Sequence, residues 1–385
     1  MRILTVDVGT GTQDIFLYDA ALDLENGYKL VMPSPTMMVH RRLKAATLSG
    51  EAVLLTGHLM GGGPSHWAAR DHIRAGHALY ATPAAARTFN DDLDYVQREM
   101  GVRIVGEDEV RALAGRVQHL ELKDFDYPLI TRACAVFGVE ARFDAVAVAV
   151  FDHGDAPPGY SDRQFRFDYL DGFIRQTQRL TGLAHRAEAV PAAMTRLQAV
   201  VTTARAQGVE VPLMVMDTAP AAVLGATLDP YVAQHLQRGA LVANIGNFHC
   251  LAFRLDAAGI GGLFEHHTGE VTRAKLDGFL TALADGTLRH AEVFDDLGHG
   301  ALVYDPRPMP APRRLAITGP RRSLLRGPGS AAGRGLEPYF AVPYGDMMLA
   351  GCFGLLAAMS EAYPEFAGPL RRSLAQTGSA APWEA

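Results

Sequence analysis

Asp7-Val8-Gly9-Thr10-Gly11-Thr12-Gln13-Asp14 stands between two apolar runs, residues 3–8 and 15–18. This arrangement predicts a strand, a tight glycine turn and a second strand. Two glycines let the backbone approach a ligand closely and point N–H groups at it. The octet therefore predicts a hairpin of the kind that cradles phosphate groups.

The polar side chains of the octet point to the same chemistry. Thr10 and Thr12 add hydroxyl donors, and Asp7 and Asp14 bracket the turn, where they would hold a hydrated divalent cation. No Gly-Lys-Ser/Thr follows, so this is not a Walker A loop. A strand ending in Asp-x-Gly-Thr also occurs in turns that bind nothing, and the octet alone leaves both interpretations open.

Composition bounds the class of protein. The 385 residues suffice for two or three domains, and 48% hydrophobic with 20% charged residues predict a folded chain with a sizeable core. The net charge of −6 gives no basic footprint for nucleic acid. The N-terminus begins a strand without a signal peptide, and the apolar run 347–359 is too short to span a bilayer. We expect a cytoplasmic protein that binds neither nucleic acid nor membrane.

Strands and helices alternate along the chain, which predicts an α/β fold with mixed sheets. We expect strands at residues 52–55, 143–151, 213–216 and 315–318, a second hairpin over 240–253, and helices from Ser65, across much of 83–130 and 163–208, and over 345–359.

A second glycine hairpin, Asn244-Ile245-Gly246-Asn247-Phe248-His249, occupies the same place in a strand–turn–strand unit as the opening octet. Their wide separation is that of two related halves, not of a short-period repeat. The sequence therefore predicts an internal duplication.

The two hairpins resemble the two phosphate hairpins of the actin-like ATPase superfamily, which joins actin, sugar kinases and heat-shock chaperone ATPases. Three later stretches resemble its other motifs in the expected order. Residues 217–226 are similar to its first connecting helix, Leu315-Ala316-Ile317-Thr318-Gly319-Pro320 to its adenosine strand and loop, and residues 345–354 to its second connecting helix. The small residues Ala350, Gly351 and Gly354 would let the two helices cross closely.

The resemblance covers nearly the whole chain and implies two lobes of duplicated actin-like, ribonuclease H-like topology, with mixed central sheets and a nucleotide in the cleft between them. It implies a first lobe over residues 1–210, with a helical insertion and completed by 346–385, and a second lobe over 211–345. The chain most resembles a branch of unknown function whose members are sometimes labelled pyruvate formate-lyase activating proteins.

The resemblance also implies ATP and Mg²⁺ as cofactors and an unknown small molecule as substrate, and it leaves a protein partner open. Asp7 and Asp14 would hold the metal. The cofactor-binding residues would be Gly9, Thr10, Gly11, Thr12, Gly246, Asn247 and Gly319. Gly61 and Gly62, in a triple glycine directly after a predicted strand, would form a further phosphate or substrate loop.

Two residues depart from the family pattern. The second hairpin begins with the neutral Asn244 where an Asp is usual, and Gly319-Pro320 replaces two adjacent glycines. ATP binding is thus implied, but rapid hydrolysis is not. The activase label also lacks support, because such enzymes hold an iron–sulfur cluster with closely spaced cysteines, whereas the three cysteines here are scattered.

Acids and histidines follow several predicted strands. In an open α/β sheet, ligand groups gather beyond the strand ends, so we expect Asp152, Asp217 or Glu265 to be the catalytic base. An alternative is a metal site shared by Asp152, His153 and one of His266 or His267, although no short ligand pattern supports it.

Three functions stay open at this point. The first is a Mg²⁺-ATP-dependent phosphotransferase or ATPase. The second is a non-catalytic nucleotide switch, favoured by the neutral Asn244. The third is a metal-dependent hydrolase that uses the His/Asp cluster and no nucleotide.

Overall fold

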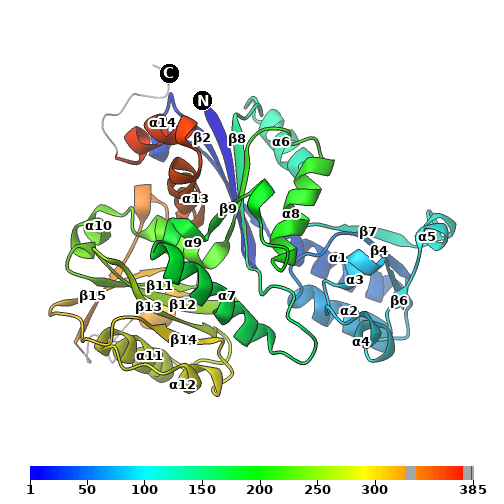
Figure 1. Cartoon of the computed structure of the whole chain (residues 1–385). Coiled ribbons are helices and arrows are strands. Elements are labelled where there is room, and N and C mark those ends of the chain that lie inside the picture. The colour runs from blue at the N-terminus through cyan, green and yellow to red at the C-terminus, as the bar shows by residue number, and fades with distance from the viewer. Residues whose placement is uncertain (327–334, 376–382, 384–385) are drawn as a thin grey trace.

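The computed structural model describes residues 1–326, 335–375 and 383. Figure 1 shows two large sheets joined through a pair of helices, with a smaller sheet set to one side. Both large sheets place an antiparallel hairpin beside parallel strands, and this repeated plan is the predicted duplication.

The first large sheet has the strand order β3-β2-β1-β8-β10-β9. Its strands are β1 (Arg2–Val8), β2 (Thr12–Asp19), β3 (Tyr28–Pro33), β8 (Ala145–Val150), β9 (Ala184–Arg186) and β10 (Leu213–Asp217). β1, β8 and β10 run parallel, while β2 and β3 turn back as antiparallel neighbours. The Ala/Val run of β8 is buried along its whole length, as expected for a central strand covered on both faces.

The second large sheet repeats this plan in the order β14-β13-β12-β11-β15-β16. Its strands are β11 (Ala240–Ile245), β12 (His249–Asp256), β13 (Gly259–His267), β14 (Gly300–Val303), β15 (Arg313–Thr318) and β16 (Leu336–Phe340). β11 pairs antiparallel with β12 and parallel with β15, as β1 pairs with β2 and β8. The two matching sheets confirm the predicted actin-like fold.

Helices cover the sheets of both lobes (Figure 1). In the first lobe they are α6 (Tyr127–Val136) and α8 (Thr195–Ala206), while α7 (Asp162–Thr177) extends from the first lobe and contacts β14 of the second. In the second lobe they are α10 (Pro230–Leu236), α11 (Arg273–Asp285) and α12 (His290–Phe294). α14 (Pro364–Leu374) follows the last connecting helix.

The insertion between β3 and β8 contains a sheet in addition to the predicted helices. It holds a parallel sheet in the order β6-β5-β4-β7, built from β4 (Val53–Gly57), β5 (Leu79–Ala81), β6 (Arg103–Ile104) and β7 (Gln118–Leu122). Its helices are α1 (Pro35–Ser49), α2 (Pro64–Arg74), α3 (Pro83–Ala86), α4 (Leu93–Arg98) and α5 (Glu107–Leu113). A core cluster of its own, drawn only from residues 39–122, stabilises this unit. β5 and β6, with three and two residues, are too short to show a period in the sequence.

Each of the two connecting helices follows one large sheet in the chain and also contacts the other. α9 (Thr218–Ala226) follows the first sheet and contacts β11 and β15 of the second, while α13 (Ala350–Ala362) follows the second sheet and contacts β1 and β8 of the first. A Cβ at Gly225 would overlap the carbonyl of Ala350, and one at Gly354 would overlap that of Ala221. Only glycine permits this crossing, as the small-residue pattern predicts.

The boundary expected at residue 211 needs one correction. β10, at Leu213–Asp217, pairs with β8 and therefore belongs to the first sheet. The chain leaves the first lobe after Asp217, where α9 begins. The sequence placed this boundary too early because β10 and α9 are consecutive in the chain. A strand that is followed by a connecting helix can still pair with the preceding sheet.

Candidate nucleotide site between the lobes

The first hairpin ends in a two-residue tip. The amide of Gly9 donates to the carbonyl of Thr12 at 2.9 Å and closes the turn, which leaves Thr10 and Gly11 at the tip. Ser34, just before α1, fixes this tip because its hydroxyl donates to the Thr10 carbonyl at 2.6 Å and its amide donates to the Gly11 carbonyl at 3.1 Å. The insertion thus begins by holding the hairpin in place.

The second hairpin is built in the same way. The amide of Gly246 donates to the carbonyl of His249 at 3.0 Å, leaving Asn247 and Phe248 at the tip. Here Thr268 does the holding, with its hydroxyl donating to the Gly246 carbonyl at 2.9 Å and its amide to the Phe248 carbonyl at 2.8 Å. The equivalence proposed from sequence therefore extends to the bonds that support each turn.

The two tips meet across a cavity of about 160 Å³. A Cβ at Gly11 would lie 2.5 Å from Nδ2 of Asn247, so a side chain at Gly11 would push the tips apart. Gly319 approaches from a third side with a φ of +97°, which favours glycine, and a Cβ there would meet Oδ1 of Asn244. Every predicted metal or cofactor residue except Gly11 lines this cavity, namely Asp7, Gly9, Thr10, Thr12, Asp14, Gly61, Gly62, Gly246, Asn247 and Gly319.

Asp7 and Asp14 are directly opposed in the β1–β2 ladder and are each 7% exposed. Burial raises the pKa of Asp7 to about 7, although a hydrogen bond from the Thr218 hydroxyl to Oδ1, at 2.5 Å, opposes this. Burial and the nearby Asp7 charge raise the pKa of Asp14 to about 8. Two like charges facing each other at low exposure are costly unless a proton or a cation joins them.

Three residues that line the cavity carry a buried polar atom with no hydrogen-bond partner in the described part of the chain. These atoms are Oδ1 of Asp14, Oγ1 of Thr318 and Nε2 of His249. Leaving such a group unsatisfied costs about 1–3 kcal/mol, and native proteins do so rarely. A polar ligand in the cavity would satisfy all three.

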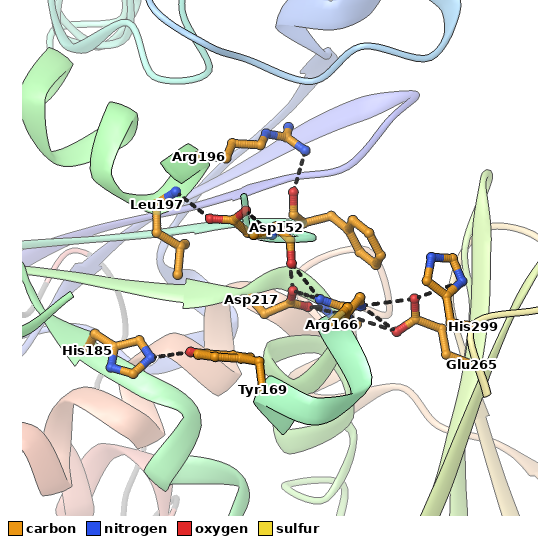
Figure 2. Close-up of polar contacts among 12 residues, drawn as sticks. Asp152, Arg166, Tyr169, His185, Arg196, Leu197, Asp217, Glu265 and His299 are labelled. Carbon is orange, nitrogen blue, oxygen red and sulfur yellow. Dashed lines mark hydrogen bonds and ion pairs between the residues drawn. The ribbon is translucent and has the colours of Figure 1, made fainter. Parts of the chain in front are cut away.

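The three predicted catalytic acids do not line this cavity. Asp217 and Glu265 lie on either side of Arg166, a residue that the sequence did not single out (Figure 2). Nη1 of Arg166 donates to Oδ2 of Asp217 at 2.6 Å, and Nη2 donates to Oε2 of Glu265 at 2.8 Å. Arg166 comes from α7 of the first lobe and Glu265 from β13 of the second, so this triad joins the lobes.

The triad leaves Asp217 and Glu265 little freedom to act as bases. Asp217 also accepts the amides of Asp152 and Ala219, at 3.3 and 2.9 Å. Burial alone would lower the pKa of Arg166, but the attraction of Asp217 and Glu265 outweighs it and raises that pKa above its ordinary value. The guanidinium is therefore charged and pairs with both acids, although one positive charge offsets only one of two carboxylate charges, and burial raises the pKa of Glu265.

The backbone of Asp152 is bonded to the triad, since its carbonyl accepts from Arg166 at 2.8 Å, but its carboxylate is held by other groups (Figure 2). Its carboxylate accepts the amides of Gly154 and Leu197, both at 2.9 Å, and burial raises its pKa. Asp152 lines a second, larger cavity of about 1060 Å³ between the first lobe and the insertion. The two cavities adjoin, since the residues shared by their walls are Gly61, Gly62, Gly63, Phe151, His153 and Arg196.

Histidines gather at the inner end of the first cavity. The three residues are His153 after β8, His249 at the start of β12 and His299 before β14, each with one ligand atom within 4.8 Å of the others'. Burial lowers the pKa of His153 to about 3 and that of His249 and His299 well below the ordinary value. All three rings are thus neutral at pH 7.

This group differs from the metal site considered from sequence. Both ring nitrogens of His266 contact backbone carbonyls, those of His267 and Asp296, and Asp152 is bound to amides. In the structure, His249 and His299 lie beside His153, where the sequence suggests Asp152 and His266 or His267. Sequence reasoning missed His299 because it stands alone, and its one signal is the pair of flanking glycines, Gly298 and Gly300.

The strand order and the paired hairpins define an actin-like protein with a polar cavity between its lobes. Within that class, the chain belongs to the family described as "Putative pyruvate format-lyase activating enzyme (DUF1786)", whose model matches residues 60–324. This confirms the branch to which the sequence motifs point. No curated protein matches the sequence.

Solved structures with related folds are similar only at low identity. They include a ROK hexokinase from Thermus thermophilus (12% identity, 68% of this chain, TM-score 0.23), the protein EutJ from Carboxydothermus hydrogenoformans (12%, 92% of this chain and 89% of that one, 0.32) and a PilM–PilN type IV pilus biogenesis complex (13%, 93% and 98%, 0.39). The chain spans 47% of the length of the hexokinase. The fold assignment therefore rests on the strand order.

None of the helices formed by the described residues is both long and apolar enough to cross a membrane.

Proposed function

We propose that the protein binds ATP with Mg²⁺ in the cavity between the lobes. One observation carries this proposal: two equivalent glycine hairpins, one from each lobe, meet at a cavity whose walls hold an opposed acid pair and unsatisfied polar atoms. Glycine turns of this kind suit phosphate groups because they expose backbone amides without side chains in the way.

The residues fit the metal and the nucleotide in different parts of the cavity. Asp7 and Asp14 offer oxygen ligands, which Mg²⁺ prefers, and Oδ1 of Asp14 has no partner among the described residues. Bound there, Mg²⁺ would neutralise phosphate charge. Thr10, Thr12, Gly246 and Asn247 would hold phosphate oxygens, with the backbone of Gly9 and Gly11 shaping the first tip. Gly319 would lie against the adenosine, because it has no side chain to block it. Gly61 and Gly62 would form the wall of the cavity on the side of the insertion.

The cavity is too small to hold a whole ATP molecule in its present shape. Its volume of about 160 Å³ is below the ~300–1,000 Å³ of typical small-molecule sites. The present shape suits a phosphate chain with a metal, so we infer that the lobes part to admit the adenosine. Such an opening would separate Gly11 from Asn247.

Phosphoryl transfer to a small molecule is the finer part of the proposal. The second cavity adjoins the phosphate cradle at Gly61 and Gly62 and would hold the acceptor. Of the three predicted bases, Asp152 is the one that lines it, so we assign the base role to Asp152 and a structural role to Asp217 and Glu265. Phosphoryl transfer relies mainly on positioning and charge stabilisation, and one base suffices.

A non-catalytic nucleotide switch is the second candidate. Two observations favour it: Arg166 is paired with two of the three candidate bases, and Asn244 carries no charge. We do not extend the activity in the family description to this chain. Cys134, Cys250 and Cys352 lie in three separate core clusters, which is not the arrangement that holds an iron–sulfur cluster.

Calorimetry with Mg²⁺ and either ADP or a nonhydrolysable ATP analogue tests the proposal. We expect saturable binding to the intact chain that is lost in Gly11→Leu, because the leucine side chain would occupy the Asn247 contact. Gly172→Leu is a control for a leucine at an exposed glycine with open space around it and no left-handed backbone. Absence of binding at millimolar nucleotide would refute the proposal, and binding without turnover would select the switch.

A further inference from the structure

We propose that His153, His249 and His299 form a binding site for a divalent transition metal at the inner end of the interlobe cavity. The site is distinct from the Asp7–Asp14 pair, whose oxygen ligands suit Mg²⁺. Three neutral imidazoles suit zinc above the other common divalent ions of the cell, and three protein ligands with an open fourth position are typical of catalytic zinc. The proposal does not depend on nucleotide binding.

The ring nitrogens are close enough to converge on one ion. One nitrogen from each histidine lies within 4.8 Å of the other two. Tetrahedral zinc with Zn–N bonds of about 2.1 Å places its ligand atoms about 3.4 Å apart. Small inward movements of the rings would therefore complete the site, without a change in the strands that carry them.

The buried nitrogens lack the partners that a purely structural role would give them. Nε2 of His249 and both nitrogens of His299 are buried without a hydrogen bond within the described ranges, and His299 is 0% exposed. His72 and His266, which are also buried, are satisfied: His72 contacts Thr47 and the Ala78 carbonyl, and His266 contacts two carbonyls. Nε2 of His290 also lacks a partner among the described residues, but it lies outside this cluster. Nδ1 of His299 faces Glu265, so Nε2 of His249 and Nε2 of His299 are the two unsatisfied nitrogens that indicate a missing ligand.

Neighbouring groups orient the rings as supporting groups do at metal sites. Nδ1 of His299 lies 3.5 Å from Oε1 of Glu265, which Arg166 holds in turn (Figure 2). A carboxylate facing one nitrogen of a histidine leaves the other nitrogen for the metal. His249 is fixed by stacking on Phe151, with ring centroids 3.9 Å apart and planes at 7°.

The fourth coordination position would face the cavity. His153 and His249 line it, while His299 lies behind them. Water or a phosphate oxygen would occupy that position. Because His153 belongs to the first lobe and the other two to the second, the metal would also link the lobes beside the Arg166 triad.

Metal binding to the intact protein tests this proposal in the absence of nucleotide and Mg²⁺. The protein is stripped with chelator, incubated with Zn²⁺ or Co²⁺, desalted and analysed by elemental analysis and visible absorption. We expect one equivalent of metal per chain and the absorption bands of tetrahedral Co²⁺. In His153→Asn, His249→Asn and His299→Asn, metal affinity should fall by at least about 100-fold, beyond the 10- to 100-fold of supporting groups.

His185→Asn is the matched control. His185 is buried in the first lobe and bonded to the Tyr169 hydroxyl at 2.6 Å, in a separate place from the histidine cluster (Figure 2). It should bind metal as the wild type does. Failure of the wild type to retain Zn²⁺ or Co²⁺, or retention in all three cluster variants, would overturn the site. The wild-type Co²⁺ spectrum does not depend on whether a variant folds, and nucleotide binding measured separately keeps this result apart from the proposed function.

Discussion

Two pairs of buried carboxylates lie where the lobes meet, and they differ in what neutralises them. Asp217 and Glu265 share the guanidinium of Arg166. Asp7 and Asp14 face each other with the Thr218 hydroxyl on one side and no cation bonded to them within the described residues. Buried charges are normally paired or bound to a metal. The fold thus supplies its own cation to one pair and leaves the other for a cation from solution.

The largest effect should come from removing the internal cation. Arg166→Met leaves Asp217 and Glu265 buried and unpaired, so we expect the free energy of unfolding to fall by about 3–5 kcal/mol. Urea denaturation at pH 7 measures this. Arg175→Met is a control, because its pair with Asp171 lies at the surface with the arginine 66% exposed, and it should cost less than about 1 kcal/mol.

A loss in Arg166→Met no larger than in Arg175→Met would show that the triad does not neutralise the acids as the distances indicate. A triple variant, Arg166→Met with Asp217→Asn and Glu265→Gln, removes all three charges. It should recover part of the lost stability, because uncharged amides cost less to bury than carboxylates.

The second prediction concerns the pair without a cation. Asp7→Asn should weaken Mg²⁺-nucleotide binding by roughly 100-fold, or about 2.7 kcal/mol, because it removes a charged ligand from the proposed metal. Asn244→Ala, at the equivalent position in the second hairpin, should weaken it by less than about tenfold. Calorimetry on both variants makes the comparison. Equal losses of affinity in the two variants would mean that the first hairpin does not supply the main metal ligand.

The third prediction uses pH in the presence of chelator. Burial raises the pKa of Asp7 to about 7 and of Asp14 to about 8, from an ordinary 3.8, so the folded state favours their protonated forms. Their contribution to stability is present in full below pH 3.8, falls as the pH rises, and is gone above about pH 8.

The double variant Asp7→Asn, Asp14→Asn does not titrate here. Because each unit by which the pKa is raised corresponds to about 1.4 kcal/mol, we expect it to be more stable than the wild type by several kcal/mol at pH 9 and nearly equal at pH 4. Saturating Mg²⁺ should remove the difference at pH 9, because the metal replaces the protons. A difference that does not vary with pH would contradict the raised pKa values.

Much of the fold follows from local patterns. The glycine hairpins, the Ala/Val run of β8 and the small residues of the connecting helices each fix one element by sterics alone. Such patterns do not reveal which sheet a strand joins, so β10 was placed in the wrong lobe. They also do not reveal short parallel strands such as β6, Arg103–Ile104, whose pairing depends on residues far away.

The residues of the site also differ in whether a local sequence pattern could predict them. Asp7, Asp14 and the tip residues were predicted because they lie within one hairpin, where spacing determines position. The partner of Asp217 and Glu265 was not, because Arg166 lies in a polar stretch whose other arginines are exposed or only partly buried. A side chain that reaches across two lobes leaves no signal in its neighbours. The histidine cluster is of this kind, with members from three separate strand ends.

The smallest expected effect comes from Thr218, which contacts the proposed metal ligand Asp7 rather than the metal. The Thr218 hydroxyl donates to Oδ1 of Asp7 at 2.5 Å and lowers the pKa that burial raises. Thr218→Val removes the donor but keeps the shape, so Asp7 should hold its proton to a higher pH. We expect Mg²⁺-nucleotide affinity at pH 6.5 to fall by roughly three- to tenfold, the effect of about one hydrogen bond.

That loss should shrink by pH 9, where Asp7 is ionised with or without the hydroxyl, whereas the loss in Asp7→Asn should not depend on pH in this way. Thr218→Ser restores the donor and should restore the affinity at pH 6.5. Calorimetry at the two pH values separates the outcomes. A loss in Thr218→Val that is equal at pH 6.5 and pH 9 would mean that Thr218 contacts the nucleotide itself, and that α9 does not tune the pKa of the acid pair.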